Sequence, residues 1–238
     1  MDIKQSLEQY CTELTSQQNR LFEVYYNELI EWNEKINLTA ITAPDEAAIK
    51  HFYDSYLMLE ILHKLGEIEV PQGSKIIDVG TGAGFPGVPL KIVRPDLQLT
   101  LLDSLNKRLV FLNELLQKLG LTAATVHSRA EDAGRNPQMR EKFNFAVSRA
   151  VGNLAVLCEY CLPLVKVGGY FVAYKGADCQ EEVAAAANAV KILGGATPKL
   201  LKYTIPGGNG RALVVIKKVK STDKKYPRAG KKLKDNPL

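Results

Sequence analysis

The sequence contains no long run of apolar residues, although 46% of its 238 residues are hydrophobic. No stretch approaches the roughly 18 consecutive apolar residues that a membrane-spanning helix needs. The first residues, Met1 to Glu8, contain no apolar core of a secretion signal. These absences argue against a membrane protein and a secreted one. We therefore expect no membrane partner and a cytoplasmic location.

Cysteine and histidine are also scarce, with four and three residues. Cys158 and Cys161 stand three positions apart in an apolar stretch, but no second pair of Cys or His completes a zinc-binding set. We therefore expect no metal site. Because thiols stay reduced in the cytoplasm, the four cysteines are predicted to be buried or half-buried free thiols.

The charge is nearly balanced over most of the chain and strongly basic only near its end. The formal net charge is +5, and the stretch from Lys217 to Leu238 holds nine Lys or Arg against two Asp, which leaves about −2 for residues 1–216. A basic tail fits a polyanion such as RNA, because each phosphate neutralised by Lys or Arg releases counterions. The charge alone also allows a solvated, frayed terminus.

Hydrophobic periodicity divides the chain into three parts. Residues 3–64 carry apolar side chains at helical spacing and no strand-like alternation, which predicts a helical N-terminal extension over 1–74. From Lys75 onward, β-branched runs alternate with helical segments, as in a doubly wound parallel sheet. The prediction is an α/β fold, with a Rossmann-like seven-stranded sheet over 75–219 and a basic tail over 220–238.

The seven strands and their connections can be placed from turn residues and apolar runs. Gly120 is a stop signal for a helix over 106–119. Further helices are predicted over 153–165 and 180–193. Strands are predicted over 75–77, 97–102, 123–127, 143–148, 170–174, 200–205 and 212–219, the last two as an antiparallel hairpin.

The stretch from Ile77 to Gly87 reads IDVGTGAGFPG and continues a short β-branched run. Its glycines permit positive φ angles and remove the Cβ atoms that would hold an adenosine-bearing ligand away from the backbone. The spacing of Gly82, Gly84 and Gly87 also satisfies the dinucleotide-binding pattern, which is weak evidence when it stands alone. The glycines therefore allow either a nicotinamide cofactor or S-adenosylmethionine.

Two acidic residues bear on this choice. Asp78 stands two residues before Gly80, an order that resembles the first motif of class I S-adenosylmethionine methyltransferases. A carboxylate there favours a sulfonium and an ammonium group, whereas a pyrophosphate gains nothing from it. Asp103 ends the next predicted strand, about 19 residues beyond Gly84, which is near the spacing expected for an acid that binds ribose hydroxyls in both cofactor classes.

The end of the fourth predicted strand restricts the chemistry. Methyltransferases that act on exocyclic amines usually carry an acid or amide followed by prolines there, but this chain has Ser148, Arg149 and Ala150. No proline stands directly before any of the four cysteines, so the Pro-Cys nucleophile of cytosine-C5 enzymes is missing too. The target atom should therefore offer a free lone pair, as guanine N7 does, and catalysis would rest on proximity and orientation. A protein that is no enzyme would lack these devices as well.

Several short motifs together resemble the RsmG family, also called GidB, over nearly the whole chain. That family methylates N7 of a guanine in the 530 loop of bacterial 16S ribosomal RNA. The resemblance implies an S-adenosylmethionine-dependent rRNA (guanine-N7)-methyltransferase whose partner is the small ribosomal subunit, and we expect a monomer. The tail departs from the family's usual pattern at Asp223 and Ala229. The motifs are Asn37-Leu38-Thr39, His51-Phe52 with Asp54-Ser55, the run 78–89, Leu101 to Ser104 with Lys107-Arg108, Ser148-Arg149-Ala150, Lys175-Gly176 and Tyr226-Pro227-Arg228.

The glycine motif, the resemblance and the distribution of charge together give three sets of candidate site residues. Cofactor contacts are expected at Asp78, Gly80, Gly82, Gly84, Phe85, Asp103, Ala130, Glu131 and Arg149. RNA contacts are expected at Lys107, Arg108, Arg129, Lys175, Arg211, Lys224, Lys225 and Arg228. The catalytic residue is not identified, and its candidates are Arg149, Lys175 and His51.

Two of these residues keep alternative interpretations. Arg149 would repel a sulfonium, so it holds the methionine carboxylate, holds the target base, or forms an ordinary ion pair. His51 lies on an apolar helical face, where a satisfied core histidine and a base contact are both reasonable.

Two other functions remain to be weighed. A nicotinamide oxidoreductase would require a hydride-transfer residue that nothing after the fifth predicted strand suggests. An RNA-binding module with a non-catalytic Rossmann-like fold would keep the basic tail and have no activity.

Overall fold

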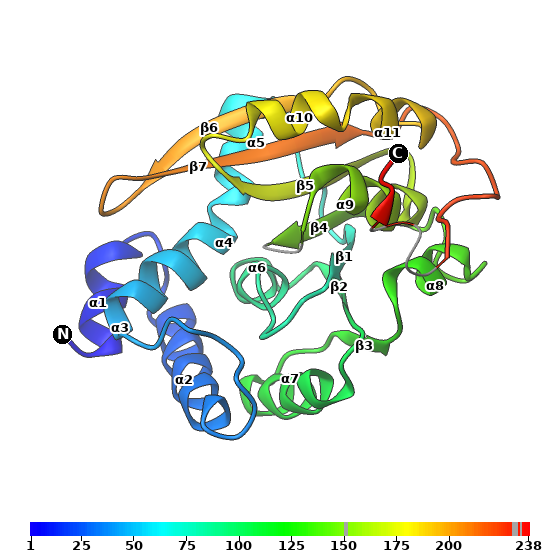
Figure 1. Cartoon of the computed structure of the whole chain (residues 1–238). Helices are drawn as coiled ribbons and strands as arrows, with labels where there is room; N and C mark the ends of the chain where they lie inside the picture. The colour runs from blue at the N-terminus through cyan, green and yellow to red at the C-terminus, as the bar shows by residue number, and fades with distance from the viewer. Residues whose placement is uncertain (150–151, 230–232, 234) are drawn as a thin grey trace.

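A computed structural model describes residues 1–149, 152–229, 233 and 235–238, so Ala150 of the Ser-Arg-Ala motif lies outside the described residues. The described strands are β1 (Lys75–Val79), β2 (Gln98–Asp103), β3 (Ala124–His127), β4 (Phe143–Arg149), β5 (Val165–Gly176), β6 (Lys199–Ile205) and β7 (Asn209–Lys217). They form one sheet in the order β3-β2-β1-β4-β5-β7-β6 (Figure 1). The first five strands run parallel, and β7 pairs antiparallel with β5 and β6. The predicted fold class and the closing hairpin are confirmed.

The N-terminal part is helical, as its periodicity predicted. Asp2 and Thr15 accept hydrogen bonds from the backbone N–H groups of Gln5 and Gln18, whose side chains bond back, and these capping boxes fix the starts of the first two helices. A π-helical turn interrupts the later helical run. The elements are α1 (Ile3–Tyr10), α2 (Ser16–Asn33), α3 (Pro44–Glu46), the π-helical segment η1 (Ala47–Tyr53), α4 (Asp54–Tyr56) and α5 (Met58–Gly66).

Both faces of the sheet are covered, because successive residues of each strand point to opposite sides. Ile76 belongs to one core cluster with α2, α5, α6 (Gly87–Val93) and α7 (Asn106–Leu119). Ile77 belongs to the other, with α8 (Ala130–Arg135), α9 (Leu154–Cys161), α10 (Gln180–Ala185) and α11 (Ala187–Ile192). The N-terminal helices therefore share a core with the sheet, and the domain boundary at residue 74 stays a prediction.

Two predicted helices differ from the structure. The helix predicted over 153–165 ends at Cys161, because Pro163 cannot continue it, and a 3₁₀ turn, η2 (Leu162–Leu164), leads directly into β5. The helix predicted over 180–193 bends at Ala186, which lets Ala189 and Val190 pack into the core.

Other local predictions are confirmed. Helix α7 spans Asn106–Leu119, and Gly120 ends it with a φ of 63°. The four cysteines are buried free thiols. Within the described part of the chain, no helix is long and apolar enough to cross a membrane.

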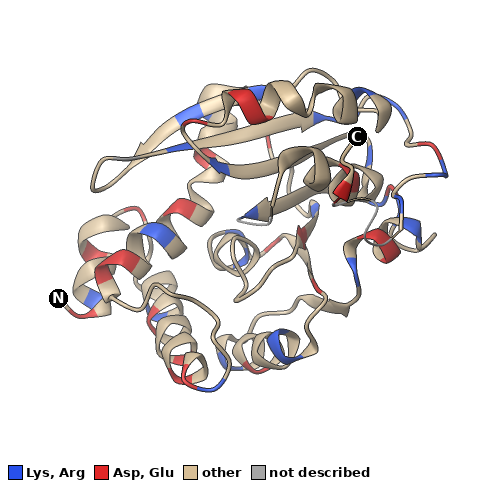
Figure 2. Ribbon diagram, in the orientation of Figure 1, with Lys and Arg blue, Asp and Glu red and all other residues tan. Residues whose placement is uncertain are grey.

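The tail runs back along the molecule past α8 and α9 (Figures 1 and 2). Arg140 donates to the carbonyl oxygens of Thr222, Asp223 and Tyr226. Leu233 is buried in the second core cluster. Because these contacts fix the described part of the tail to the body, a frayed terminus is not what the structure shows there.

Candidate functional site

The glycine loop follows β1 at the point where the sheet order reverses, since β1 pairs with β2 on one side and β4 on the other. Ligands of open α/β sheets bind at such a switch point, beyond the carboxyl ends of the strands. Gly80 and Gly82 have φ angles of 72° and 59°. A Cβ atom on Gly82 would meet no described part of the chain within 4 Å, so the loop presents bare backbone there.

Gly84 does not fit the role expected for it. A Cβ atom on this residue would lie 2.6 Å from the hydroxyl of Tyr25 and 2.9 Å from Leu112 Cδ2. Gly84 therefore faces the helices of the first core cluster, and it lines none of the cavities described below. Its glycine serves close packing between the loop and these helices.

Asp78 lies behind the loop and is fully buried. Its Oδ2 accepts hydrogen bonds from Thr81 Oγ1 at 2.7 Å and Gly87 N at 2.9 Å, and its Oδ1 has no hydrogen-bond partner among the residues that the structure describes. Burial raises the pKa of this carboxyl from 3.8 to about 6, although the bonds from Thr81 and Gly87 act in the opposite direction. Asp78 is thus placed to hold the loop, whereas the sequence suggested an attraction to the ligand's positive groups.

Two cavities adjoin the loop and share Gly80 and Arg108. The larger cavity has a volume of about 760 Å³ and contains Gly82, Phe85, Arg149, Lys175 and Arg211 from the predicted site. The smaller has a volume of about 180 Å³ and contains Asp103, Arg129, Ala130 and Glu131. The structure therefore gathers these residues from five other stretches of sequence around one loop.

The smaller cavity is lined by polar groups suited to a nucleoside. Asp103 is buried, and its carboxylate accepts from the backbone N–H groups of Gly82 and Leu105. Arg108 lies 3.3 Å from it. Glu131, which is 6% exposed, faces the same space, where Tyr160 supplies apolar surface. Acids at these two positions can accept hydrogen bonds from ribose hydroxyls and from a base.

Phe85 forms one wall of the larger cavity within a stack of rings. Its ring centroid lies 4.4 Å from that of His51 and 5.2 Å from that of Tyr25, with interplanar angles of 13° and 14°. The Arg149 guanidinium lies 4.9 Å from the same ring. Tyr25 also donates its hydroxyl to the carbonyl of Ala83 at 2.6 Å. The stack therefore fixes the N-terminal helices to the glycine loop.

His51 is 8% exposed, and its Nε2 lies 2.8 Å from the Thr39 hydroxyl. Burial, with smaller contributions from Arg149 and Lys50, lowers the pKa of His51 from 6.5 to about 3. The imidazole is therefore neutral at physiological pH. Its ring lines the cavity and also packs against Phe85. The position of His51 is therefore compatible both with a core histidine and with a contact to the target base.

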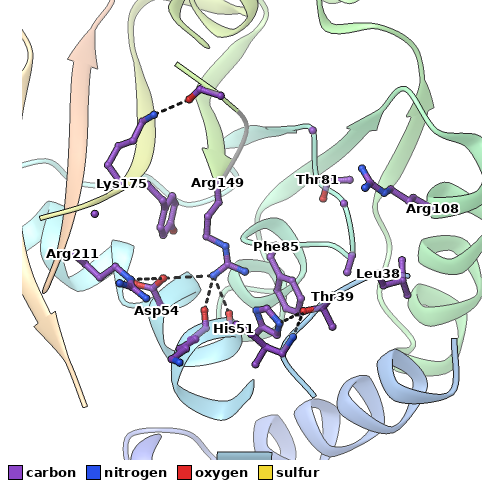
Figure 3. A pocket seen from close by; sticks show the side chains of 18 residues that line it. Leu38, Thr39, His51, Asp54, Thr81, Phe85, Arg108, Arg149, Lys175 and Arg211 are labelled. Atoms are coloured by element: carbon purple, nitrogen blue, oxygen red, sulfur yellow. Dashed lines mark hydrogen bonds and ion pairs between the residues drawn. The ribbon is translucent and has the colours of Figure 1, made fainter. Parts of the chain in front are cut away.

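Arg149 extends from the end of β4 to the N-terminal helices (Figure 3). Its Nη1 donates to the carbonyl of Lys50 and the hydroxyl of Ser55, both at 3.0 Å, and lies 3.6 Å from Asp54 Oδ2. Arg211 lies at the same distance from Asp54. These contacts support the ion-pair interpretation of Arg149, which holds the helical wall of the cavity in place.

The remaining predicted cations differ in how much they are engaged. Lys175 is an ion-pair partner of Glu182 at 2.7 Å and also donates to the carbonyl of Gly152. Arg228 pairs with the buried Glu159 at 2.8 Å. The side chain of Arg129 is 68% exposed. Lys107, Lys224 and Lys225 are exposed as well.

Comparisons with known proteins show which family the chain belongs to. A family model described as rRNA small subunit methyltransferase G, or GidB, matches residues 18–205. The chain belongs to this family. It is therefore a methyltransferase with S-adenosylmethionine as the methyl donor, as the resemblance of its motifs implied. Two family members are similar over nearly their whole length.

Both relatives carry the name ribosomal RNA small subunit methyltransferase G. The protein of Desulforamulus reducens is 52% identical over 228 residues, which cover 95% of this chain and 92% of the relative. That of Lactobacillus johnsonii is 49% identical, with coverages of 93% and 92%. The described fold is also similar to a solved structure from Methanococcus maripaludis, described as a candidate S-adenosyl-L-methionine-dependent methyltransferase, with a TM-score of 0.54, 16% identity and coverages of 84% and 94%. This last likeness supports the fold.

The residues around the loop fit this family's cofactor. The bare backbone at Gly82 leaves space where any side chain would project, and Asp103 and Glu131 supply acceptors for a nucleoside. Gly80 borders both cavities, so one molecule could extend from the smaller into the larger past this residue. We propose that the nucleoside part would lie in the smaller cavity and the methyl-bearing part in the larger.

Sequence reasoning missed part of the larger cavity. Leu38, Thr39 and Asp54 line it, and all three belong to motifs that carried the resemblance without being assigned a role. Lys50 and Tyr174 also line it, and no local pattern marks them. The motifs around residues 37–55 were the signal that could have found this wall.

The buried, neutral His51 makes a testable contribution to stability. Its folded-state pKa lies below the unfolded value, so below about pH 6.5 the unfolded chain binds a proton that the folded chain does not. Its contribution is complete above that pH and is lost as the pH falls. We expect the free energy of unfolding, wild type minus His51→Gln, to decrease by about 2 kcal/mol between pH 7 and pH 5. Urea titrations at both pH values measure this, and a pH-independent difference would contradict a neutral His51.

Proposed function

We propose that this methyltransferase acts on N7 of a guanine in the 530 loop of 16S ribosomal RNA within the small ribosomal subunit. The name of the family and of its members supports an rRNA substrate. The choice of N7 rests on the chemistry of the larger cavity. A substrate in the small ribosomal subunit supports a cytoplasmic location for the protein.

The observation that carries the choice of N7 is that the titratable side chains at the larger cavity are engaged in contacts of their own. Asp54 accepts from the Tyr203 hydroxyl at 2.8 Å and faces two arginines. Lys175 is paired with Glu182. The hydroxyl of Tyr174 donates to the Ser55 carbonyl, and burial raises its pKa well above the usual value. His51 Nε2 lies 2.8 Å from the Thr39 hydroxyl, and burial lowers the pKa of His51 to about 3, so this imidazole is a weak base. Among the lining residues that the structure describes, none is therefore placed as a free general base.

An unprotonated ring nitrogen needs no such base. Guanine N7 keeps its lone pair in the plane of the ring and loses no proton on methylation, so the site has only to hold it in line with the donor. S-adenosylmethionine supplies an electrophilic methyl group when bound. The chain supplies the bare loop at Gly82, the ring of Phe85 as an apolar wall, and the wall that Arg149 fixes. We propose that this wall orients the target guanine.

Cations at the cavity mouths and on the tail suit an RNA backbone. Arg108 and Arg211 line the larger cavity, and Arg129 lies at the smaller one. Lys224 and Lys225 project from the tail. Contacts of this kind position the RNA without selecting a base. The exposed large apolar side chains come from separate segments, among them Val24, Leu65 and Val167, and this scatter supports a monomer.

Transfer of a labelled methyl group tests the proposal. The protein is incubated with labelled S-adenosylmethionine and either unmodified 30S subunits or protein-free 16S rRNA, and the product nucleoside is identified by mass spectrometry. We expect label in 7-methylguanosine within the 530 loop of at least one substrate. Label in another nucleoside would overturn the choice of N7. Cofactor binding with no transfer to either substrate would mean that the proposed substrate is wrong.

A further inference from the structure

We infer that the C-terminal segment 222–228 positions the cofactor cavity, and that Arg228 and Arg140 act there as positioning residues. The sequence assigned Arg228 to RNA. Its contacts instead connect the tail to α8 and α9, the two helices that carry Glu131 and Tyr160 of the smaller cavity. The inference rests on S-adenosylmethionine as cofactor and not on the identity of the methylated base.

Arg140 makes the first connection. Its Nη1 donates to the carbonyl of Gly134 in α8 and to the carbonyl of Tyr226, both at 2.8 Å, and its Nη2 donates to the carbonyl of Thr222 at 2.7 Å. One guanidinium thus joins the end of α8 to the tail. A fourth hydrogen bond joins Nη2 to the carbonyl of Asp223 at 3.2 Å. Because the guanidinium is a rigid, charged fork, these bonds hold α8 and the tail at a fixed distance from each other.

Direct packing reinforces this connection. A Cβ atom on Gly134 would lie 3.0 Å from Pro227 Cγ and 3.2 Å from its Cδ, so the proline ring already sits against the α8 backbone. Gly134 is three residues after Glu131, less than one helical turn away. A displacement of the tail would therefore move the carboxylate that lines the smaller cavity.

Arg228 makes the connection to α9. Its backbone N–H and its Nε donate to Glu159 Oε1 at 2.6 and 3.0 Å, and its Nη2 donates to Oε2 at 2.8 Å. Glu159 is 1% exposed, so its charge depends on this partner. The next residue, Tyr160, lines the cavity. An arginine whose carboxylate partner is buried and bidentate is poorly placed to neutralise an RNA phosphate.

The segment also has its own anchor. Lys218, which is fully buried, donates to Thr222 Oγ1 at 2.6 Å, and the Thr222 N–H donates to Glu141 at 2.8 Å. Lys224 and Lys225 lie within the same segment but are exposed, and Lys225 Nζ lies 3.9 Å from Asp223 Oδ2 and 5.3 Å from the centroid of the Tyr226 ring. Cations for RNA and contacts for the cofactor cavity are therefore neighbours in sequence and separable by mutation.

Calorimetric titration with S-adenosylmethionine and S-adenosylhomocysteine tests the inference on the full chain without RNA. We expect Arg228→Ala and Arg140→Lys to raise the cofactor Kd about 5- to 10-fold. The KM for the RNA substrate should stay within about twofold. Arg228→Lys, which keeps the charge on Glu159's partner, should restore part of the affinity. Gly134→Ala, which changes no charge, should weaken cofactor binding in the same direction.

The matched control is the double variant Lys224→Ala with Lys225→Ala, which should leave the cofactor Kd unchanged and raise the KM for RNA, with a weaker salt dependence. Thermal melts identify any variant that is unfolded at the assay temperature. If Arg228→Ala is unfolded there, the cofactor affinities of Arg228→Lys and Gly134→Ala test the inference in its place. Unchanged cofactor affinity in folded Arg228→Ala and Gly134→Ala would overturn the inference. So would a selective loss of RNA affinity in Arg228→Ala.

Discussion

Replacing Asp78 with alanine should reduce the kcat/KM for methyl transfer by roughly 100-fold, with most of the loss in cofactor affinity. The carboxylate is fully buried and accepts from Thr81 Oγ1 and the Gly87 N–H. Alanine would leave both donors without an acceptor inside the protein, and each such loss costs about 1–3 kcal/mol. The loop between them, which carries Gly80 and Gly82, would then lose its fixed shape. Steady-state kinetics and calorimetric titration with S-adenosylhomocysteine measure both parts of the effect.

Asp78→Asn is the matched control, because it keeps one oxygen for the two donors and removes the charge. Burial raises the pKa of Asp78 to about 6, so its charge is already costly, and we expect the asparagine variant to retain cofactor affinity within about a fewfold. Full activity in the alanine variant would contradict a loop-holding role. If the asparagine variant were as inactive as the alanine variant, the negative charge itself would be needed, as the sequence motif suggested.

Local sequence patterns predicted those parts of the structure that local interactions determine. Gly80 and Gly82 could be assigned because positive φ angles and absent Cβ atoms have physical causes that a sequence shows. Helix α7 could be bounded because Gly120 ends it in the left-handed region. Asp103 could be placed because parallel strands of similar length end at one edge of the sheet.

Residues whose roles depend on distant partners could not be assigned in this way. Gly84 belongs to the same glycine series as Gly82, yet Tyr25, 59 residues earlier, occupies the space its Cβ would need. Arg228 lies in a basic run, and only the fold brings Glu159 to it. In both cases the local pattern suggested a contact with a ligand, but a tertiary contact inside the protein determines what surrounds the residue.

The wall of the larger cavity shows the same limit. Helical periodicity over residues 3–64 predicted that this wall is helical, but not that Arg149 would donate to the carbonyls of Lys50 and His51 across the molecule. An arginine after a strand suggests a ligand contact when it is considered alone. Its partners lie about 100 residues away in sequence, beyond the reach of any pattern.

Replacing the target guanosine with 7-deazaguanosine should abolish methyl transfer. The substitution exchanges N7 for a C–H group, which has no lone pair, and leaves the Watson–Crick edge and N2 unchanged. Because the lining residues that the structure describes offer no free general base, no neighbouring atom of guanine should be activated in its place. The measurement is transfer to 16S rRNA that carries the analogue only at the position identified by mass spectrometry, in whichever form of the substrate supports methylation.

Binding must be measured beside transfer, since an altered RNA could simply fail to bind. The analogue RNA should compete with unmodified RNA at equal affinity, because the proposed contacts of Arg108, Arg129 and Arg211 with phosphates do not involve N7. A second control RNA, with 7-deazaadenosine at a neighbouring adenosine, should be methylated at the normal rate. Methylation of the 7-deazaguanosine RNA would show that another atom is the acceptor. Methylation at N3, which has a lone pair of its own, would need no base. Methylation at N1, N2 or O6 would need a base to remove a proton, and Asp54 or Lys175 would then have to leave its ion pair, or His51 its contact with Thr39, to serve as one.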